Sequence, residues 1–266
     1  MRLVCLGDSF TEGMSDDPRP DGQYTGWADR VAMSLAQRES LTGGTLEYAN
    51  LAVRGKLLDQ VIAEQIPVAI SLSPTLLTFH AGPNDVLRRG TDFDDLARRY
   101  RGAVASLDGH DAQVVLFTAI GRAGGKGRLA EALADRFGRF NEVVRQTAAQ
   151  HGALVVDLEM VTALADRRLW NEDRLHLNPD GHRRVAAAVL ETVGEDDPAI
   201  IGGPSGWWLE PLPPGADAGR RADLAADVRW IRRHLVPWVG RRLRGVSSGD
   251  GRRAKDPLPR VVRPRT

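Results

Sequence analysis

Hydrophobic residues in the first 203 positions fall into short continuous runs that alternate with longer amphipathic segments. The runs are rich in Val, Leu and aromatic residues, and each ends at a glycine, an asparagine or a polar cluster. Continuous rather than alternating apolarity is typical of parallel strands that are buried on both faces of a sheet. The pattern predicts five strands, at residues 3–6, 46–51, 75–79, 113–118 and 153–158.

The segments between and after these runs carry apolar residues at helical spacing. After the fifth run, Asn178 is placed to cap a helix whose first residue is Pro179. Helices are expected at residues 27–37, 57–70, 94–107, 129–151 and 179–192. Alternating strands and helices predict a three-layer α/β/α sandwich with a five-stranded, mostly parallel sheet. In such sheets, ligands bind beyond the carboxyl ends of the strands.

The chain changes character after Gly203, so we divide it into a domain over 1–203 and an extension over 204–266. The extension holds 14 Lys and Arg residues against 6 Asp and Glu, a formal charge of +8, whereas the first part carries −7. Such asymmetry indicates two regions with different roles. The pattern predicts a Pro/Trp linker over 204–215, a basic amphipathic helix over 218–235 and a disordered tail over 247–266.

Three roles are open for this C-terminal helical extension. Its apolar stripe can pack on the first domain, or the helix can lie on an anionic membrane surface. Contact with nucleic acid through arginine is the least favoured role, because no known nucleic-acid-binding module is present. A non-catalytic binding protein that uses the extension to contact membrane or nucleic acid is the alternative to an enzyme.

Composition excludes several other classes of protein. The single cysteine, Cys5, rules out an internal disulfide framework and a zinc-finger cluster. No window approaches the run of about 20 apolar residues that a membrane-spanning helix needs. The first apolar run is too short for a secretory signal. A reducing, cytoplasmic location is the simplest expectation, and a secreted protein without disulfides whose signal was cut away is the alternative.

Polar segments that could carry chemistry follow four of the five predicted strands. Ser9 lies in L-G-D-S-F-T-E-G, Gly55 in N-L-A-V-R-G and Asn84 in H-A-G-P-N-D. After the fifth strand, Asp173 and His176 lie three residues apart in D-R-L-H. This spacing lets the carboxylate bind the imidazole Nδ1–H and leaves Nε2 free to act as a base. Taken alone, the Ser9, Gly55 and Asn84 segments are better explained by ordinary glycine turns and loops, and a lone D-x-x-H is commonly a helix entry.

Taken together and in this order, the four segments resemble those of the SGNH (GDSL-type) hydrolase superfamily. The resemblance covers roughly the first three quarters of the chain and implies a flavodoxin-like α/β/α fold. It implies that Ser9 is the nucleophile, that His176 is the general base and that Asp173 orients it. It also implies an oxyanion hole made by the Ser9 and Gly55 amides and the Asn84 side chain.

The resemblance implies a serine esterase that forms an acyl-enzyme and needs neither a metal nor an organic cofactor. A metal site is not indicated by the residues either, because no H-E-x-x-H motif or Cys cluster is present. The expected partner is a small-molecule carboxylic ester with an acetyl or other short acyl group. Whether its alcohol is a lipid or a sugar stays open, as does the oligomeric state.

Overall fold

Six strands form one central sheet in a computed structural model that describes residues 1–88, 90–120, 128–215, 230, 232–233 and 247–264. The strand order across the sheet is β5-β4-β3-β1-β2-β6. The first five strands run parallel to their neighbours, whereas β6 pairs antiparallel with β2 at one edge. The strands are β1 (Arg2–Gly7), β2 (Leu46–Asn50), β3 (Leu76–His80), β4 (Gln113–Phe117), β5 (Leu154–Val156) and β6 (Asp256–Val262).

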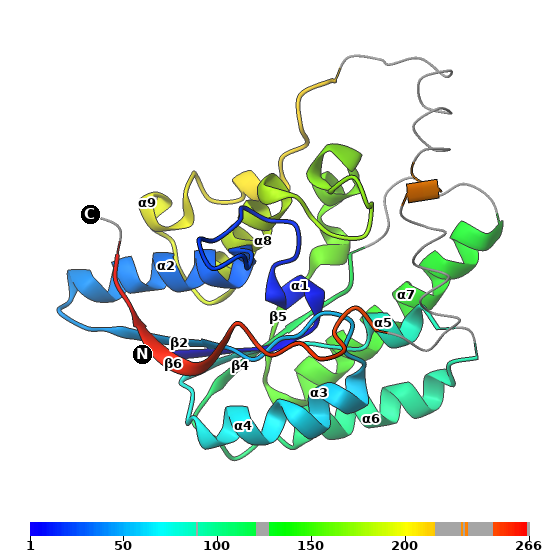
Figure 1. Cartoon of the computed structure of the whole chain (residues 1–266), viewed down its shortest axis with the longest axis horizontal. Helices are drawn as coiled ribbons and strands as arrows, with labels where there is room; N and C mark the ends of the chain where they lie inside the picture. Colours follow the sequence, from blue (N-terminus) through cyan, green and yellow to red (C-terminus); the bar gives the residue numbers. More distant parts are fainter. Residues whose placement is uncertain (89, 121–127, 216–229, 231, 234–246, 265–266) are drawn as a thin grey trace.

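Helices cover both faces of the sheet and complete the three layers (Figure 1). One face carries α2 (Gly26–Leu41), α8 (Pro179–Thr192) and α9 (Pro198–Ile201). The other carries α3 (Leu58–Glu64), α4 (Ile66–Ser71), α6 (Phe93–Ala105) and α7 (Arg128–His151). Two single turns, α1 (Ser9–Glu12) and α5 (Pro83–Val86), follow β1 and β3. Short 3-10 turns are η1 (Leu158–Met160), η2 (Thr162–Ala165), η3 (Arg167–Leu169) and η4 (Trp207–Leu209).

Burial on both faces of β1 explains why its sequence is apolar without alternation. Leu3 and Cys5 belong to the core beneath α2 and α8, whereas Val4 and Leu6 belong to the core on the opposite side. All four side chains are fully buried. Full burial of an aliphatic side chain stabilises the fold by about 1.5–3 kcal/mol. The predicted parallel strands and the α/β sandwich are therefore confirmed.

The helix predicted over 57–70 is instead two helices, α3 and α4. Pro67 lies in the first turn of α4, where its missing N–H costs no hydrogen bond. In the interior of a helix a proline would break the hydrogen-bond pattern, so α3 does not continue through Pro67. At the junction, the Gln65 side chain pairs with both backbone groups of Gly7, with Gly7 N–H to Oε1 at 2.8 Å and Nε2 to Gly7 O at 2.9 Å. The break between α3 and α4 therefore places the Gln65 side chain where it holds the end of β1.

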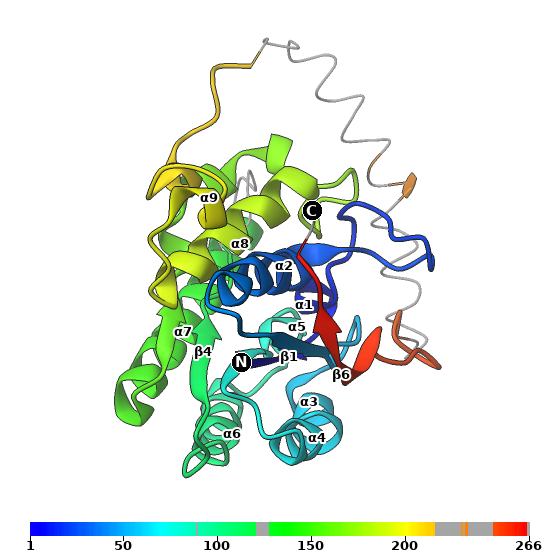
Figure 2. The same cartoon turned by 90° about the vertical axis from the view of Figure 1, so that its left-hand side faces the viewer.

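The prediction of a five-stranded sheet and a disordered tail is wrong for residues 256–262, which form β6. Its sequence contains Pro257 and Pro259, which disfavour a central strand but are tolerated at the edge of a sheet. The ladder aligns Leu46 with Val262 and Tyr48 with Arg260. Figure 2 shows β6 beside β2 at the edge of the sheet. The last strand therefore comes from the predicted extension.

The amphipathic helix predicted over 218–235 falls almost entirely outside the described residues. Its membrane-surface and nucleic-acid roles stay predictions. In the described part of the chain, no helix has both the length and the apolar character needed to cross a bilayer.

Candidate active site

Ser9 lies at the carboxyl end of β1, where the strand turns sharply into α1. Gly7 adopts a φ of +152°, and a Cβ there would lie 2.6 Å from the carbonyl oxygen of His80, so the turn requires glycine. Asp8 caps the new helix by accepting a hydrogen bond from the Phe10 N–H at 3.0 Å. Ser9 is thus presented at the edge of the sheet where ligands are expected.

Asn84 joins the Ser9 turn to the loop that follows β2. It lies in α5, directly after β3, and its side-chain amide donates to Asp8 Oδ2 at 2.8 Å and to the Lys56 carbonyl at 3.0 Å. Residues 53–56, which we name the Gly55 loop, are therefore held beside the Ser9 turn. Three of the four predicted segments meet here. To bind an oxyanion, the Asn84 amide would have to exchange one of these acceptors for it.

A buried ion pair holds the Gly55 loop against α1. The Glu12 carboxylate accepts hydrogen bonds from the Arg54 backbone N–H at 2.5 Å and from Arg54 Nε at 2.8 Å. Both residues are more than nine-tenths buried, where an ion pair is screened little by solvent. Sequence reasoning missed this pair, although both residues lie within the motifs that contain Ser9 and Gly55.

Asp173 and His176 form a pair within residues 171–178, which we name the His176 loop. Asp173 Oδ2 lies 2.7 Å from His176 Nδ1, while Asp173 Oδ1 accepts from the backbone N–H groups of Leu175 and His176. Burial raises the pKa of Asp173, but the hydrogen bond and charge of His176, with these backbone donors, outweigh it and hold the pKa below its usual value. The carboxylate is therefore ionised at neutral pH and can orient the imidazole.

Arg174, between the two members of the pair, adopts a left-handed conformation with φ of 57°. A non-glycine residue in this region carries strain of about 1–3 kcal/mol. Here the strain accompanies a tight turn in which the Asn171 N–H donates to the His176 carbonyl at 2.8 Å. The turn folds the D-R-L-H segment back on itself, which brings the Asp173 carboxylate to the imidazole.

His182, at the start of α8, connects this side of the site to the Ser9 side. Its Nδ1 accepts from the Trp27 N–H at 3.3 Å, and its Nε2 donates to the Met14 carbonyl at 3.1 Å. Burial lowers the pKa of His182 to about 4, so the ring is neutral at pH 7 and serves as a structural link. Met14 follows α1 closely, so α8 is tied to the helix that begins with Ser9.

Hydrogen bonds thus join the segments that contain Ser9, Gly55 and Asn84 in one group, and Asp173 with His176 in another. Among the residues that the structure describes, no hydrogen bond joins the Ser9 hydroxyl to the His176 ring. The Ser9–His176 pairing, and with it the complete triad and oxyanion hole, stays a prediction.

Trp27 and Cys5 belong to the core between the sheet and α2. Trp27 is fully buried, and its ring is tilted against that of Phe10, with centroids 5.6 Å apart. Burial raises the pKa of Cys5 to about 12, which makes its thiol a poor nucleophile at neutral pH. Within the described ranges, no three His, Cys, Asp or Glu residues gather in an arrangement that could hold a metal ion.

Residues 5–184 match the GDSL-like Lipase/Acylhydrolase family. The acetylxylan esterase Axe2 from Geobacillus stearothermophilus is similar in structure, with a TM-score of 0.57 and 24% identity over 73% of this chain and 94% of that chain. TesA is also similar, with a TM-score of 0.57 and 19% identity over 73% of this chain and 98% of that chain. No curated protein sequence matches the chain. The family match spans all four candidate segments, whereas residues 185–266 lie outside it.

Proposed function

The chain belongs to the GDSL-like lipase/acylhydrolase family and is a serine ester hydrolase, and we propose that it acts through Ser9, His176 and Asp173. The observation that carries this proposal is the 2.7 Å contact between Asp173 Oδ2 and His176 Nδ1. A carboxylate at Nδ1 holds the imidazole in the tautomer whose Nε2 can accept a proton. Without such a base, a serine hydroxyl is a weak nucleophile.

In the proposed reaction, Ser9 Oγ forms a bond to the ester carbonyl carbon while its proton passes to His176 Nε2. The resulting oxyanion would be held by the Ser9 and Gly55 backbone N–H groups and by the Asn84 side chain. Collapse breaks the bond to the alcohol oxygen, which takes the proton from His176. Water, deprotonated by His176, then attacks the acyl carbon and releases the carboxylic acid and Ser9.

We infer that the acyl group is short, with acetate as the first candidate. The structural similarity to an enzyme described as an acetylxylan esterase supports an acetyl group and favours a sugar over a lipid as the alcohol. The polar residues in the loops after the strands also favour a small acyl group over a long alkyl chain.

The test is a panel of p-nitrophenyl esters of increasing chain length, assayed beside acetylated xylooligosaccharides. We expect the largest kcat/KM for acetyl or other short acyl groups, and labelling of the wild-type protein by a fluorophosphonate at Ser9. Ser9→Ala should remove both the labelling and the turnover while the protein stays folded. Wild-type turnover by folded Ser9→Ala would contradict the triad, and a preference for long acyl chains would contradict the substrate.

A further inference from the structure

Residues 247–250, which we name the C-terminal turn, pack directly on the backbone of the Gly55 loop. Ser247 Oγ donates to the Gly55 carbonyl at 3.3 Å. A Cβ on Gly249 would lie 2.0 Å from the Arg54 carbonyl oxygen, and a Cβ on Gly55 would lie 2.4 Å from Ser247 Oγ. Neither glycine has room for a side chain, so two backbones that are distant in sequence are in close contact.

This contact involves the peptide group between Arg54 and Gly55. Gly249 lies against its carbonyl oxygen, while Glu12 binds the backbone N–H and the guanidinium of Arg54. A peptide group is planar, so the direction of the Arg54 carbonyl also determines the direction of the Gly55 N–H. The C-terminal turn therefore touches the unit whose N–H is a proposed oxyanion donor.

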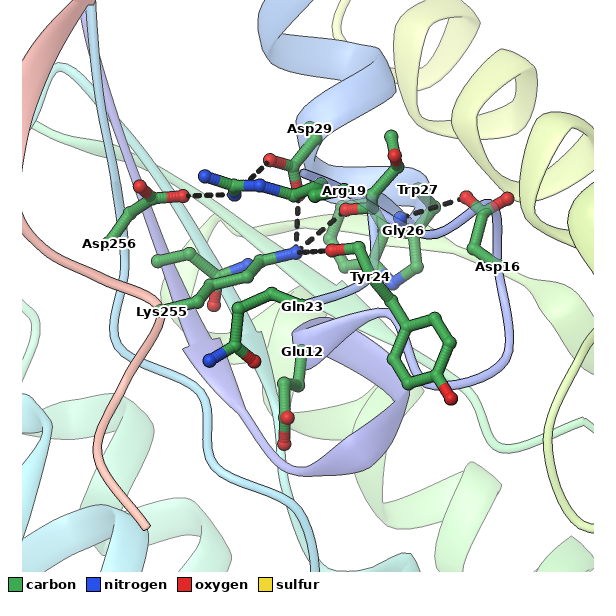
Figure 3. Close-up of polar contacts among 12 residues, drawn as sticks. Glu12, Asp16, Arg19, Gln23, Tyr24, Gly26, Trp27, Asp29, Lys255 and Asp256 are labelled. Carbon is green, nitrogen blue, oxygen red and sulfur yellow. Dashed lines mark hydrogen bonds and ion pairs between the residues drawn. The ribbon is translucent and has the colours of Figure 1, made fainter. Parts of the chain in front are cut away.

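A buried lysine anchors the chain just after the turn (Figure 3). The Lys255 ammonium donates to the carbonyls of Tyr24 at 2.9 Å and Thr25 at 2.7 Å, and to the Asp29 carboxylate. Its side chain has no exposed surface. All three ammonium protons have acceptors, which offsets the cost of burying the charge.

An ion-pair network and β6 extend this anchor. Arg19 binds Asp256 at 2.9 Å and Asp29 at 3.2 Å, so one guanidinium bridges the start of β6 and α2 (Figure 3). The strand then pairs with β2, from which the chain continues into the Gly55 loop. Residues 247–262 are thus attached at two neighbouring places: β6 pairs along β2, and the C-terminal turn packs on the Gly55 loop, which follows β2.

We propose that the C-terminal turn is a positioning element for ester hydrolysis, which orients the Gly55 N–H toward the oxyanion by backing the Arg54–Gly55 peptide. The proposal rests on the proposed function of Gly55. It assigns a catalytic contribution to a segment outside the part of the chain that matches the family. Ser247 and Gly249 act through Gly55 and do not touch the substrate in this role.

The decisive variant is Gly249→Ala, because its methyl group must displace either the turn or the Arg54 carbonyl. We expect kcat to fall by about 10- to 100-fold, less than the factor of about 10²–10³ for complete removal of an oxyanion donor. KM should change little, because the oxyanion develops only in the transition state. Rates are normalised to active sites titrated with a fluorophosphonate, so that a smaller folded fraction does not count as a slower enzyme.

Gly102→Ala is the matched control, since the same methyl group in α6 meets nothing within 4 Å. It should leave kcat and KM at wild-type values.

A second pair of variants covers the case in which Gly249→Ala does not fold. Ser247→Ala, which removes the hydroxyl, should lower kcat by about 2- to 10-fold, as expected for one hydrogen bond. Ser247→Thr, which retains the hydroxyl, should restore most of the rate.

Wild-type kcat in folded Gly249→Ala would overturn the proposal, as would an equal loss in Gly102→Ala. If Gly249→Ala does not fold, wild-type kcat in Ser247→Ala would overturn it. An increase in kcat/KM would also overturn it, because the turn would then obstruct the site. Turnover that does not depend on Ser9 would overturn the proposed function and this inference together. Ser9-dependent turnover that is insensitive to the turn would overturn this inference alone.

Discussion

The two sides of the candidate site are held in place by different kinds of contact. The His176 loop largely holds itself, because Asp173 binds the His176 ring and accepts from two backbone N–H groups within three residues. The Trp230 indole also contacts it, by donating to the Asp173 carbonyl at 2.8 Å. The geometry of the Asp173–His176 pair is therefore mainly a property of one short segment.

The Gly55 loop, by contrast, depends on residues that are far away in the sequence. Glu12 binds Arg54 across 42 positions, and Ser247 binds Gly55 across 192. Asn84 reaches back 28 residues to the Lys56 carbonyl. The Asp173–His176 contact is thus specified locally, whereas the proposed oxyanion site needs several strands of the sheet to be assembled first.

The largest effect should come from Asp173→Asn, on the locally built side. If Asp173 orients His176, kcat should fall by about 10⁴-fold, because the amide favours the wrong imidazole tautomer. Asn keeps an Oδ1 acceptor for the backbone N–H groups of Leu175 and His176, so the loop should stay folded. Ester hydrolysis and thermal unfolding measure the two effects.

Asp166→Asn is the matched control for that change. Asp166 is also paired, with Arg168 at 2.6 Å, and caps η3, outside the candidate site. Its replacement should leave kcat unchanged. A loss of less than about tenfold in Asp173→Asn would show that the Asp173–His176 contact is structural rather than catalytic.

The second-largest effect is expected at the Gly55 loop, which depends on residues that are distant in the sequence. Glu12→Gln removes the charge that compensates the buried Arg54 guanidinium, and breaking a buried ion pair costs about 3–5 kcal/mol. We expect that loss in the free energy of unfolding, measured by urea denaturation. The kcat should fall as well, because Glu12 also holds the Arg54 backbone N–H.

Glu64→Gln is its control, because the partner Lys56 belongs to the same Gly55 loop. Glu64 keeps 52% of its side-chain surface exposed, and exposed ion pairs contribute about 0–1 kcal/mol. Equal losses in the two variants would mean that the Glu12–Arg54 pair contributes no more than a surface pair.

The same contrast explains what could be predicted from the sequence. Strands buried on both faces and a D-x-x-H segment leave local patterns, so the parallel sheet and the Asp173–His176 contact were predictable. The Glu12–Arg54 pair was not, because nothing in either motif identifies its partner. The strand β6 was not predictable either. Its prolines and charges favour disorder, and its anchor Lys255 binds Asp29, 226 residues earlier.

The smallest effect concerns His182, which ties the helix after the His176 loop to the chain after α1. Burial lowers the pKa of His182 to about 4, against 6.5 for a free imidazole. Between these values the unfolded chain binds the proton and the folded protein does not, so stability rises with pH. Acidification from pH 6.5 to 4 should therefore remove up to about 3 kcal/mol of the free energy of unfolding.

Urea denaturation at several pH values from 4 to 7.5 measures this slope. His182→Gln removes the titrating group, so its free energy of unfolding should depend less on pH across that window. His110→Gln replaces an exposed imidazole and should keep the wild-type slope. If His182→Gln kept that slope as well, the acid sensitivity would arise elsewhere. Protonation of His182 at Nδ1 would then not be what breaks its contact with the Trp27 N–H.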